Sequence, residues 1–279
     1  MFVFKNVKKL QQHLSSINDD KRVGFVPTMG ALHEGHLSLI KKAQEKSDHV
    51  VVSIFVNPTQ FDKPEDLIKY PRTLENDLKL LESVNCNVVF TPTAKEIYGD
   101  TIQSKYFTFD GLENQMEGKF RDGHFDGVGT IVKRLFEIVK PTNAFFGEKD
   151  FQQLQIIKKM VEKHNISINI VGCEIFREDD GLAMSSRNTR LSDEHRLAAP
   201  FIYKTIKKAR KKFKKNTAKK VINWVKKKFK KHPLLELEYF EIADQKTLKT
   251  IIKKDDDKRY RAFIAVFAGE IRLIDNIRL

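Results

Sequence analysis

The sequence of 279 residues has few of the cysteines that disulfides or a structural metal site would need. It contains only two cysteines, Cys86 and Cys173, which do not form a CxxC pair. A disulfide scaffold or a cysteine-based zinc site needs more thiols at closer spacing. Both cysteines lie in strand-like apolar runs, so we expect them to be packed thiols.

Long apolar runs are also missing. No stretch approaches the roughly 20 residues that a membrane-spanning helix needs. Residues 1–4 are Met-Phe-Val-Phe and the lysines follow them, which is the reverse of a signal peptide. With 41% hydrophobic and 10% aromatic residues, the composition is that of a globular protein. These features predict a cytoplasmic protein without membrane contact.

The excess of positive charge lies in one segment. The net charge is +14, from 51 Lys and Arg against 37 Asp and Glu, and residues 204–231 hold 15 basic residues and no acidic one. Such an excess can mark a nucleic-acid partner. A solvated helical face is the more common reason for such a run, so we expect no nucleic-acid partner. The alternative is an RNA-binding module that stacks bases on Phe213, Trp224 and Phe229, although these aromatics also fit the buried face of a helix.

Strand-like and helix-like segments alternate over the first 176 residues. Residues 50–56 form a continuous apolar run rich in β-branched side chains, as expected for a strand buried on both faces. The expected strands are 23–26, 50–56, 87–90, 144–146 and 167–176, and the expected helices are 36–46, 73–82, 128–139 and 150–163. This alternation predicts an α/β fold with a Rossmann-like, doubly wound parallel sheet, whose ligands bind beyond the carboxyl ends of the strands.

The pattern changes after residue 176. Polar helical stretches are expected at 193–214 and 217–231, followed by strands at 235–242, 263–267 and 271–274. This order is typical of a smaller α+β domain. The sequence therefore predicts two domains, 1–176 and 177–279.

Residues 27–37 carry the strongest chemical signal. A strand ends at Val26, and a turn leads into a helix that carries His33 and His36. A helix N-terminus attracts phosphate, and residues three apart project from one face. Imidazoles placed there can donate hydrogen bonds to phosphate oxygens and stabilise the charge that develops during in-line displacement.

Three other interpretations of this turn were weighed. Gly30 and Gly35 have the spacing of a Walker A motif, but His36 and Leu37 replace its Lys and Ser/Thr. His33 and His36 are too close together for the HExxH motif of zinc proteases. Two structural histidines remain the simplest alternative.

The turn and five further blocks resemble one known family. Residues 33–36, His-Glu-Gly-His, resemble the HxGH signature of the nucleotidylyltransferase superfamily, and residues 27–36 resemble the signature of the pantoate–β-alanine ligase (pantothenate synthetase) family. The other blocks are SIFVNPTQF at 53–61, YPRT at 70–73, FGEKDFQQL at 146–154, DGLAMSSRN at 180–188 and RLIDN at 272–276. One block is weak evidence, whereas six in the family's order are specific.

The resemblance implies a reaction in two steps. ATP, as a substrate, activates the carboxylate of (R)-pantoate as pantoyl-adenylate and releases pyrophosphate; the amine of β-alanine then displaces AMP to form pantothenate. The family also implies Mg²⁺ on the phosphates and a homodimer formed through the N-terminal domain.

The resemblance further implies which residues bind ATP. They are Met29, Gly30, Ala31, Leu32, His33, Glu34, Gly35, His36, Gly147, Glu148, Lys149, Asp150, Phe176, Met184, Ser185, Ser186 and Arg187. The catalytic residues among them are His33, His36, Lys149, Ser185, Ser186 and Arg187. His36 acts either as a proton donor or as an electrostatic stabiliser, and Asp150 holds either the ribose hydroxyls or Mg²⁺.

Residues 184–187 resemble a second phosphate-binding loop, analogous to the lysine-rich loop of class I aminoacyl-tRNA synthetases. The place of this loop just after the domain junction predicts that the C-terminal domain closes over ATP.

A second set of residues is implied to bind pantoate and β-alanine. Gln60 and Gln153 are expected to hold pantoate, because a primary amide both donates and accepts hydrogen bonds. Asn57 is expected to contact pantoate with them, and Arg121 and His124 are expected to line the part of the site that binds pantoate and β-alanine. The metal-site candidate is Asp77, at a family position near Mg²⁺ or pantoate. A cytidylyl- or adenylyltransferase of the same superfamily remains an alternative, but it gives no reason for Gln60 and Gln153.

Overall fold

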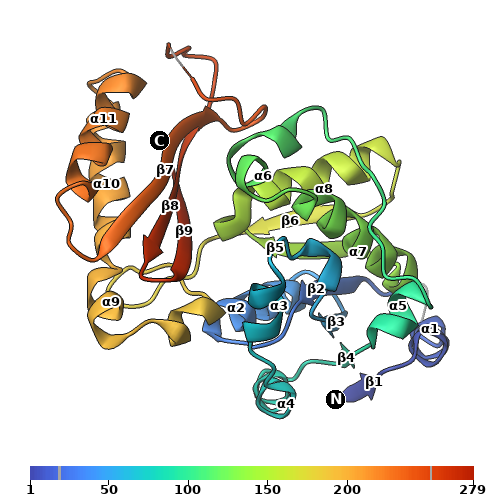
Figure 1. The fold of residues 1–279 in the computed structure, drawn as a ribbon. Coiled ribbons are helices and arrows are strands. Elements are labelled where there is room, and N and C mark those ends of the chain that lie inside the picture. The colour runs from blue at the N-terminus through green and yellow to red at the C-terminus, as the bar shows by residue number, and fades with distance from the viewer. Residues whose placement is uncertain (18–19, 252) are drawn as a thin grey trace. The chain divides into compact units, whose positions relative to one another are not determined.

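The computed structural model describes residues 1–17, 20–251 and 253–279 and divides into two compact units (Figure 1). The first unit contains Met1–Glu113, Glu117–Glu148 and Gln153–Glu174, and the second contains Asn114–Met116, Lys149–Gln152 and Ile175–Leu279. Two short inner segments thus belong to the second unit. The domains 1–176 and 177–279 stay a prediction.

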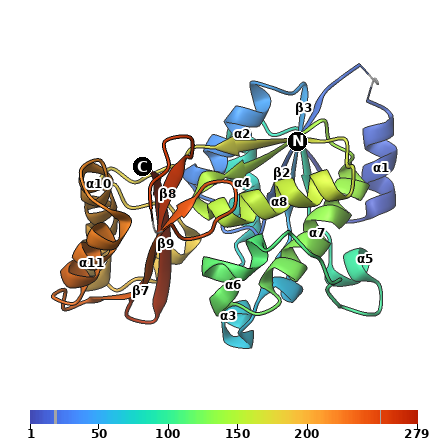
Figure 2. The same cartoon turned by 90° about the horizontal axis from the view of Figure 1, so that it is seen from above.

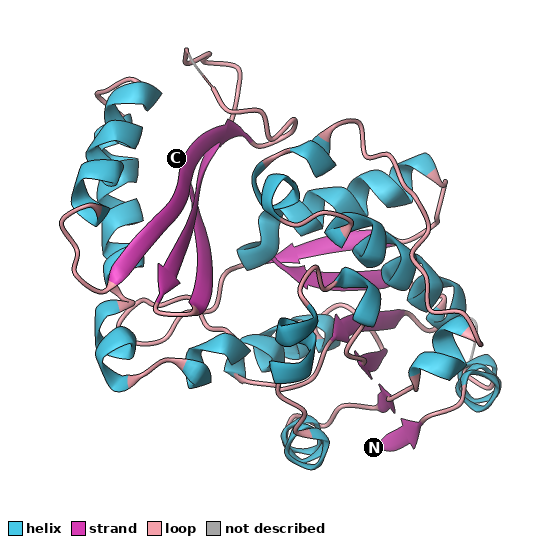
Figure 3. Ribbon diagram, in the orientation of Figure 1, coloured by secondary structure: helices cyan, strands magenta, loops and turns pink. Residues whose placement is uncertain are grey.

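A parallel sheet forms the centre of the first unit (Figure 3). Within the described residues it has six strands in the order β1-β4-β3-β2-β5-β6, and every neighbouring pair is parallel. They are β1 (Phe2–Phe4), β2 (Val23–Thr28), β3 (His49–Ile54), β4 (Val88–Phe90), β5 (Asn143–Gly147) and β6 (Asn169–Cys173). The predicted α/β fold with a Rossmann-like parallel sheet is confirmed.

Helices cover both faces of this sheet. On one face, Val26 of β2 belongs to a buried cluster with Leu37 and Ile40 of the following helix. On the other face, Phe25 meets Phe136 edge to face, with ring centroids 6.3 Å apart. Neighbouring residues of a strand point to opposite faces, so both faces need apolar side chains and the strands read as continuous apolar runs. The helices are α1 (Val7–Ser15), α2 (Glu34–Gln44), α3 (Pro64–Lys69), α4 (Leu74–Ser83), α5 (Ala94–Tyr98), α6 (Met116–Phe120), α7 (His124–Val139) and α8 (Phe151–Lys163).

Some element predictions were incomplete or wrong. Strand β1 and helix α1 were not predicted; β1 is three residues long and exposed at the sheet edge, and α1 begins after Asn6, whose side chain accepts the N–H of Lys9 at 3.1 Å. The strand expected at 167–176 is limited to β6. Cys86 precedes β4 rather than lying in a strand, but both cysteines are buried, and burial raises the pKa of each thiol to about 11. The prediction of packed thiols is confirmed.

The second unit has an antiparallel sheet with helices on one face (Figure 2). Its strands are β7 (Leu235–Asp244), β8 (Tyr260–Ala268) and β9 (Ile271–Arg278), and its helices are α9 (Asp193–Ala198), α10 (Phe201–Phe213) and α11 (Ala218–Phe229). Ile206 of α10, Val225 of α11 and Ile264 of β8 share one buried core. The single helix expected at 193–214 is wrong: it is two helices separated at Pro200, because proline has no N–H to continue a helix.

The basic helices bury the aromatics that an RNA-binding surface would need. Phe213 and Phe229 are core residues, and Trp224 is partly buried against the same core. The lysines of α10 and α11 therefore lie on the outer face of a helical layer, which favours the solvated-face interpretation. Among the described helices, none is long and apolar enough to cross a membrane.

Candidate active site

The histidine-bearing turn begins where β2 ends. Gly30 and Ala31 both have left-handed backbone conformations, with φ of 80° and 49°. Thr28 stabilises the entry to the turn, because its hydroxyl donates to the carbonyl of Ser53 at 2.7 Å and accepts the N–H of Gly30 at 3.2 Å. Only glycine adopts the first conformation readily, which explains the glycine in the motif. The turn is thus a defined, partly strained structure.

Asp77 of α4 lies against the back of this turn. Its Oδ2 accepts the N–H of Ala31 at 3.0 Å, and its Oδ1 accepts the N–H of Leu32 at 2.8 Å. The hydroxyl of Thr73 also donates to Oδ1, at 3.0 Å. The side chain is buried, with Asp77 1% exposed. Sequence reasoning placed Asp77 near the site but did not anticipate that it binds the turn's backbone.

The two histidines of the motif lie together at the start of α2. His33 is the N-cap residue, and its carbonyl accepts the N–H groups of His36 at 2.8 Å and Leu37 at 3.1 Å. The two imidazole rings have centroids 4.1 Å apart and are tilted by 33°. The expectation that both rings project from one face of the first turn is confirmed. Two imidazoles are therefore available side by side beyond the carboxyl end of a central strand.

The side chain of Gln60 is held beside the same turn by two residues. It ends a short 3₁₀ helix, Pro58–Gln60. Its amide nitrogen donates to the sulfur of Met29 at 3.1 Å, and its amide oxygen accepts from the amide of Asn57 at 3.1 Å. Asn57 is buried and also binds the carbonyl of Gly127 at the start of α7 and the hydroxyl of Tyr98. The structure thus brings the predicted residues Met29, Asn57 and Gln60 together.

Arg121 and His124 support Gln60 from the other side. The carbonyl of Gln60 accepts from Nδ1 of His124 at 2.7 Å and from the guanidinium of Arg121 at 3.3 Å. A carbonyl cannot donate, so Nδ1 of His124 carries the proton; Nε2 then accepts from Arg121 at 3.1 Å. Burial and the adjacent Arg121 charge lower the pKa of His124 to about 4. His124 is therefore a neutral residue with one defined tautomer.

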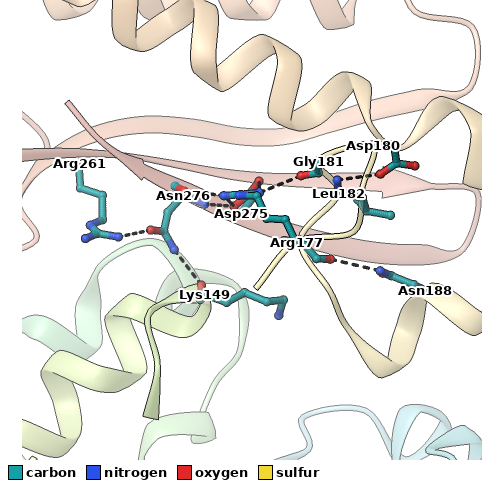
Figure 4. Close-up of polar contacts among 10 residues, drawn as sticks. Lys149, Arg177, Asp180, Gly181, Leu182, Asn188, Arg261, Asp275 and Asn276 are labelled. Carbon is teal, nitrogen blue, oxygen red and sulfur yellow. Dashed lines mark hydrogen bonds and ion pairs between the residues drawn. The ribbon is translucent and has the colours of Figure 1, made fainter. Parts of the chain in front are cut away.

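The second unit contains the other predicted phosphate-binding residues, Lys149 and residues 185–187, and it holds a buried ion pair (Figure 4). Arg177 binds both carboxylate oxygens of Asp275, at 2.7 and 2.8 Å, and its guanidinium carbon lies 3.7 Å from the centroid of the Tyr203 ring. Asp275 is 3% exposed and Arg177 16%. Burial raises the pKa of the Asp275 carboxyl, and the Arg177 charge opposes that rise. Sequence reasoning quoted Asp275 within a block but assigned no role to Arg177.

Lys149 and Asp150 are connected to this centre through the backbone. The amide of Asn276 donates to the carbonyl of Lys149 at 2.9 Å, as Figure 4 shows. The ammonium group of Lys149 lies 3.5 Å from a carboxylate oxygen of Asp150. Gly147 and Glu148 precede them at the end of β5 and belong to the first unit. Both charged side chains of the predicted pair therefore lie at the carboxyl end of a parallel strand.

The loop that contains Met184, Ser185, Ser186 and Arg187 is ordered by its own hydrogen bonds. The N–H of Met184 donates to the carbonyl of Phe176 at 3.0 Å, and the hydroxyl of Ser185 accepts the N–H of Arg187 at 3.3 Å. Gly181 has φ of 93°, and a Cβ at this position would lie 2.5 Å from the ring of Tyr203. The loop is thus fixed to α10 at its base.

Two further predicted residues, Phe176 and Gln153, differ in their exposure. Phe176 is 39% exposed, and Gln153 is partly buried in the first turn of α8. Asn188, which is labelled in Figure 4, supports the loop of residues 184–187. Its amide donates to the carboxylate of Glu178 at 2.7 Å and to the carbonyl of Ala183 at 3.2 Å. Arg196 pairs with Glu178 and Asp180. Sequence reasoning missed this charged support, because acidic and basic residues in a loop carry no signal of their partners.

The fold and the turn define an α/β nucleotide-binding protein with an HxGH-type turn at the carboxyl end of β2. A sequence profile described as pantoate-beta-alanine ligase matches residues 2–278. A pantothenate synthetase from Christiangramia forsetii is 57% identical over 100% of this chain and 99% of its own length, and one from Flavobacterium psychrophilum is 55% identical over 100% of both. The chain belongs to the pantoate–β-alanine ligase family.

Solved structures agree with the sequence relatives. Pantothenate synthetase from Thermus thermophilus superposes with a TM-score of 0.92 at 36% identity, over 99% of both chains. Pantoate-beta-alanine ligase from Francisella tularensis, complexed with beta-gamma ATP and beta-alanine, superposes with a TM-score of 0.83 at 36% identity, over 100% of this chain and 97% of the other.

Proposed function

We propose that this protein condenses (R)-pantoate with β-alanine at the expense of ATP. A pantoate carboxylate oxygen attacks the α-phosphorus of ATP, and the bond from that phosphorus to the pyrophosphate oxygen breaks. The β-alanine amine then attacks the acyl carbon of pantoyl-adenylate, AMP leaves, and the nitrogen loses a proton. Family membership over the whole chain supports this reaction, as does the Francisella relative with its nucleotide and β-alanine.

The observation that carries the proposal is the placement of paired imidazoles beside a fixed primary amide. His33 and His36 present two rings 4.1 Å apart, and Gln60 is bonded to Met29 of the same turn. In the proposed reaction the imidazoles stabilise phosphate charge, and the amides of Gln60 and Gln153 bind the hydroxyl and carboxylate groups of pantoate. Asn57, expected to share in this, is buried with its amide bonded to Gln60 and Gly127, so its part in the proposal is to hold Gln60. A nucleotidyltransferase with a phosphorylated acceptor would not need the side-chain amides of Gln60 and Gln153.

Arg121 and His124 have a positioning role in this proposal. Both donate to the backbone carbonyl of Gln60, so they fix the residue that binds pantoate. Their place on the pantoate and β-alanine side remains the expectation of the resemblance.

Phosphate charge is offset by Lys149, Ser185, Ser186 and Arg187 of the second unit. Lysine acts as a point cation, and the guanidinium and hydroxyl groups donate in directions that suit phosphate oxygens. The remaining predicted nucleotide contacts are with the backbone and side chains of Met29–His36, Gly147–Asp150, Phe176 and Met184. Closure of the C-terminal domain over ATP is part of this proposal, because it would exclude water from the adenylate.

In the proposed site Mg²⁺ would bind together with the nucleotide phosphates rather than in a site made by protein side chains alone. Among the described residues, no group of three or more His, Cys, Asp or Glu side chains is arranged to hold a metal. Mg²⁺ commonly binds through substrate phosphates and one or two carboxylates and keeps several waters. Asp150, which is half exposed beside Lys149, is the carboxylate available for this role. When bound, the ion would offset phosphate charge.

The test is a pyrophosphate assay with each substrate omitted in turn. Purified protein is expected to release pyrophosphate from ATP only when pantoate is present, and AMP in quantity only after β-alanine is added. Pyrophosphate without pantoate, or none with it, would refute the proposal. We also propose that the protein is a homodimer and is located in the cytoplasm. Sedimentation of the purified protein at the mass of one chain, 32.4 kDa, would exclude the dimer.

A further inference from the structure

We propose that Asp77 is a positioning residue that holds the histidine-bearing turn in its active shape, and that it is not a magnesium ligand. The inference rests on the proposed function, because it assigns a role in that reaction. It also replaces the metal-site expectation for Asp77. Asp77 and the groups it binds all belong to the first unit.

The carboxylate of Asp77 is already occupied by protein donors. Two backbone N–H groups, of Ala31 and Leu32, and the hydroxyl of Thr73 donate to it at 2.8 to 3.0 Å. A carboxylate offers about four acceptor positions, so three are used. Oδ2 is faced by Gly30, where a Cβ would lie only 3.0 Å from it. The side chain is 1% exposed, which leaves no room for the waters that Mg²⁺ retains.

One of the two backbone donors, Ala31, has an unfavourable backbone conformation. Ala31 has φ of 49°, a left-handed conformation that disfavours residues with a Cβ, and it follows Gly30 at 80°. Bonds from N–H groups to a carboxylate are shorter and stronger than neutral ones. Asp77 therefore stabilises two consecutive peptide groups in an orientation that the chain would not hold alone.

The consequence is the position of the imidazoles. Leu32 directly precedes His33, the N-cap of α2, whose carbonyl accepts the N–H groups of His36 and Leu37. Fixing the N–H of Leu32 therefore fixes where α2 begins and where both rings point. Misplacement of a reacting group by about 1 Å can reduce a rate by about 100-fold.

The test compares Asp77→Asn with Glu75→Gln, which removes an equal charge from an exposed position in the same helical turn. For Asp77→Asn we expect kcat for pyrophosphate release to fall about 10- to 100-fold. The KM for ATP and the Mg²⁺ concentration at half-maximal rate should change less than about twofold. Glu75→Gln should match the unaltered protein. Recovery of the rate at high Mg²⁺, or an unchanged kcat, would overturn the proposal.

A second readout does not depend on activity. In protein labelled with ¹⁵N at alanine and leucine, the amide protons of Ala31 and Leu32 should move upfield in Asp77→Asn and not in Glu75→Gln. Unmoved resonances of Ala31 and Leu32 would overturn the positioning role of Asp77. Failure of the unaltered protein to release pyrophosphate would refute only the proposed reaction, and the NMR test of Asp77 would still hold. Thr73→Ala removes one of the three donors to Asp77, so it should lower kcat less than Asp77→Asn does and leave the Mg²⁺ dependence unchanged. If Asp77→Asn does not fold, Thr73→Ala tests the positioning role in its place, and an unchanged kcat would then contradict that role.

Discussion

The buried imidazole of His124 makes a quantitative prediction about acid sensitivity. Nδ1–H of His124 donates to the carbonyl of Gln60 and Nε2 accepts from Arg121, so the folded protein stabilises the neutral ring. Its pKa falls from 6.5 to about 4, first because of burial and then because of the Arg121 charge. The unfolded chain takes up a proton below pH 6.5 and the folded chain does so only near pH 4. The stability that His124 contributes is therefore complete above pH 6.5 and is lost as the pH falls towards 4, by about 3 kcal/mol in all.

Urea unfolding of the unaltered protein and of His124→Asn isolates this contribution. Asparagine retains a donor near the position of Nδ1 and does not titrate. Between pH 7.5 and 5.0 the stability advantage of the unaltered protein over the variant should shrink by about 2 kcal/mol, since contributions from other groups cancel in the difference. An advantage that stays constant within about 0.5 kcal/mol over this range would refute the neutral, buried state of His124.

Two other perturbations follow from the contacts. His36→Ala should retain the urea midpoint of the parent but lose pantoate-dependent pyrophosphate release, and normal turnover would remove its proposed role. Arg177→Met leaves the carboxylate of Asp275 buried without its partner and should lower the free energy of unfolding by about 3–5 kcal/mol; a loss below about 1 kcal/mol in urea unfolding would show that the pair is not a stabilising unit. The lysine-rich residues 204–231 should show no RNA affinity by filter binding at modest salt, because two of the three candidate aromatics are in the core; tight binding would contradict this.

Much of the sheet could be predicted because its strands are buried on both faces. Residues 50–56 read as one apolar, β-branched run, and β3 covers His49–Ile54. By contrast, β1 is short and exposed, so it carries no such pattern. The division of the helical stretch at Pro200 does have a signal in the sequence, because proline has no N–H to continue a helix.

The candidate site shows the same limit at the level of side chains. His33 and His36 could be paired from their spacing, because a helix places residues three apart on one face. The partners of Asp77 could not, since Ala31 and Leu32 are more than 40 residues away and contribute only backbone N–H groups. The same holds for Arg177 and Asp275, which are separated by 98 residues. Residue type predicts chemistry well, whereas the assignment of a buried charge requires the folded partners.

In the proposed reaction the carboxylate of pantoate is activated as an adenylate. The most direct test of this step uses pantoate labelled with ¹⁸O in both carboxyl oxygens, incubated with ATP, β-alanine and the purified protein. Attack of the carboxylate on the α-phosphorus transfers one labelled oxygen to AMP, so mass spectrometry should find one ¹⁸O atom in each AMP formed. Unlabelled AMP, or label in inorganic phosphate instead, would contradict the acyl-adenylate route.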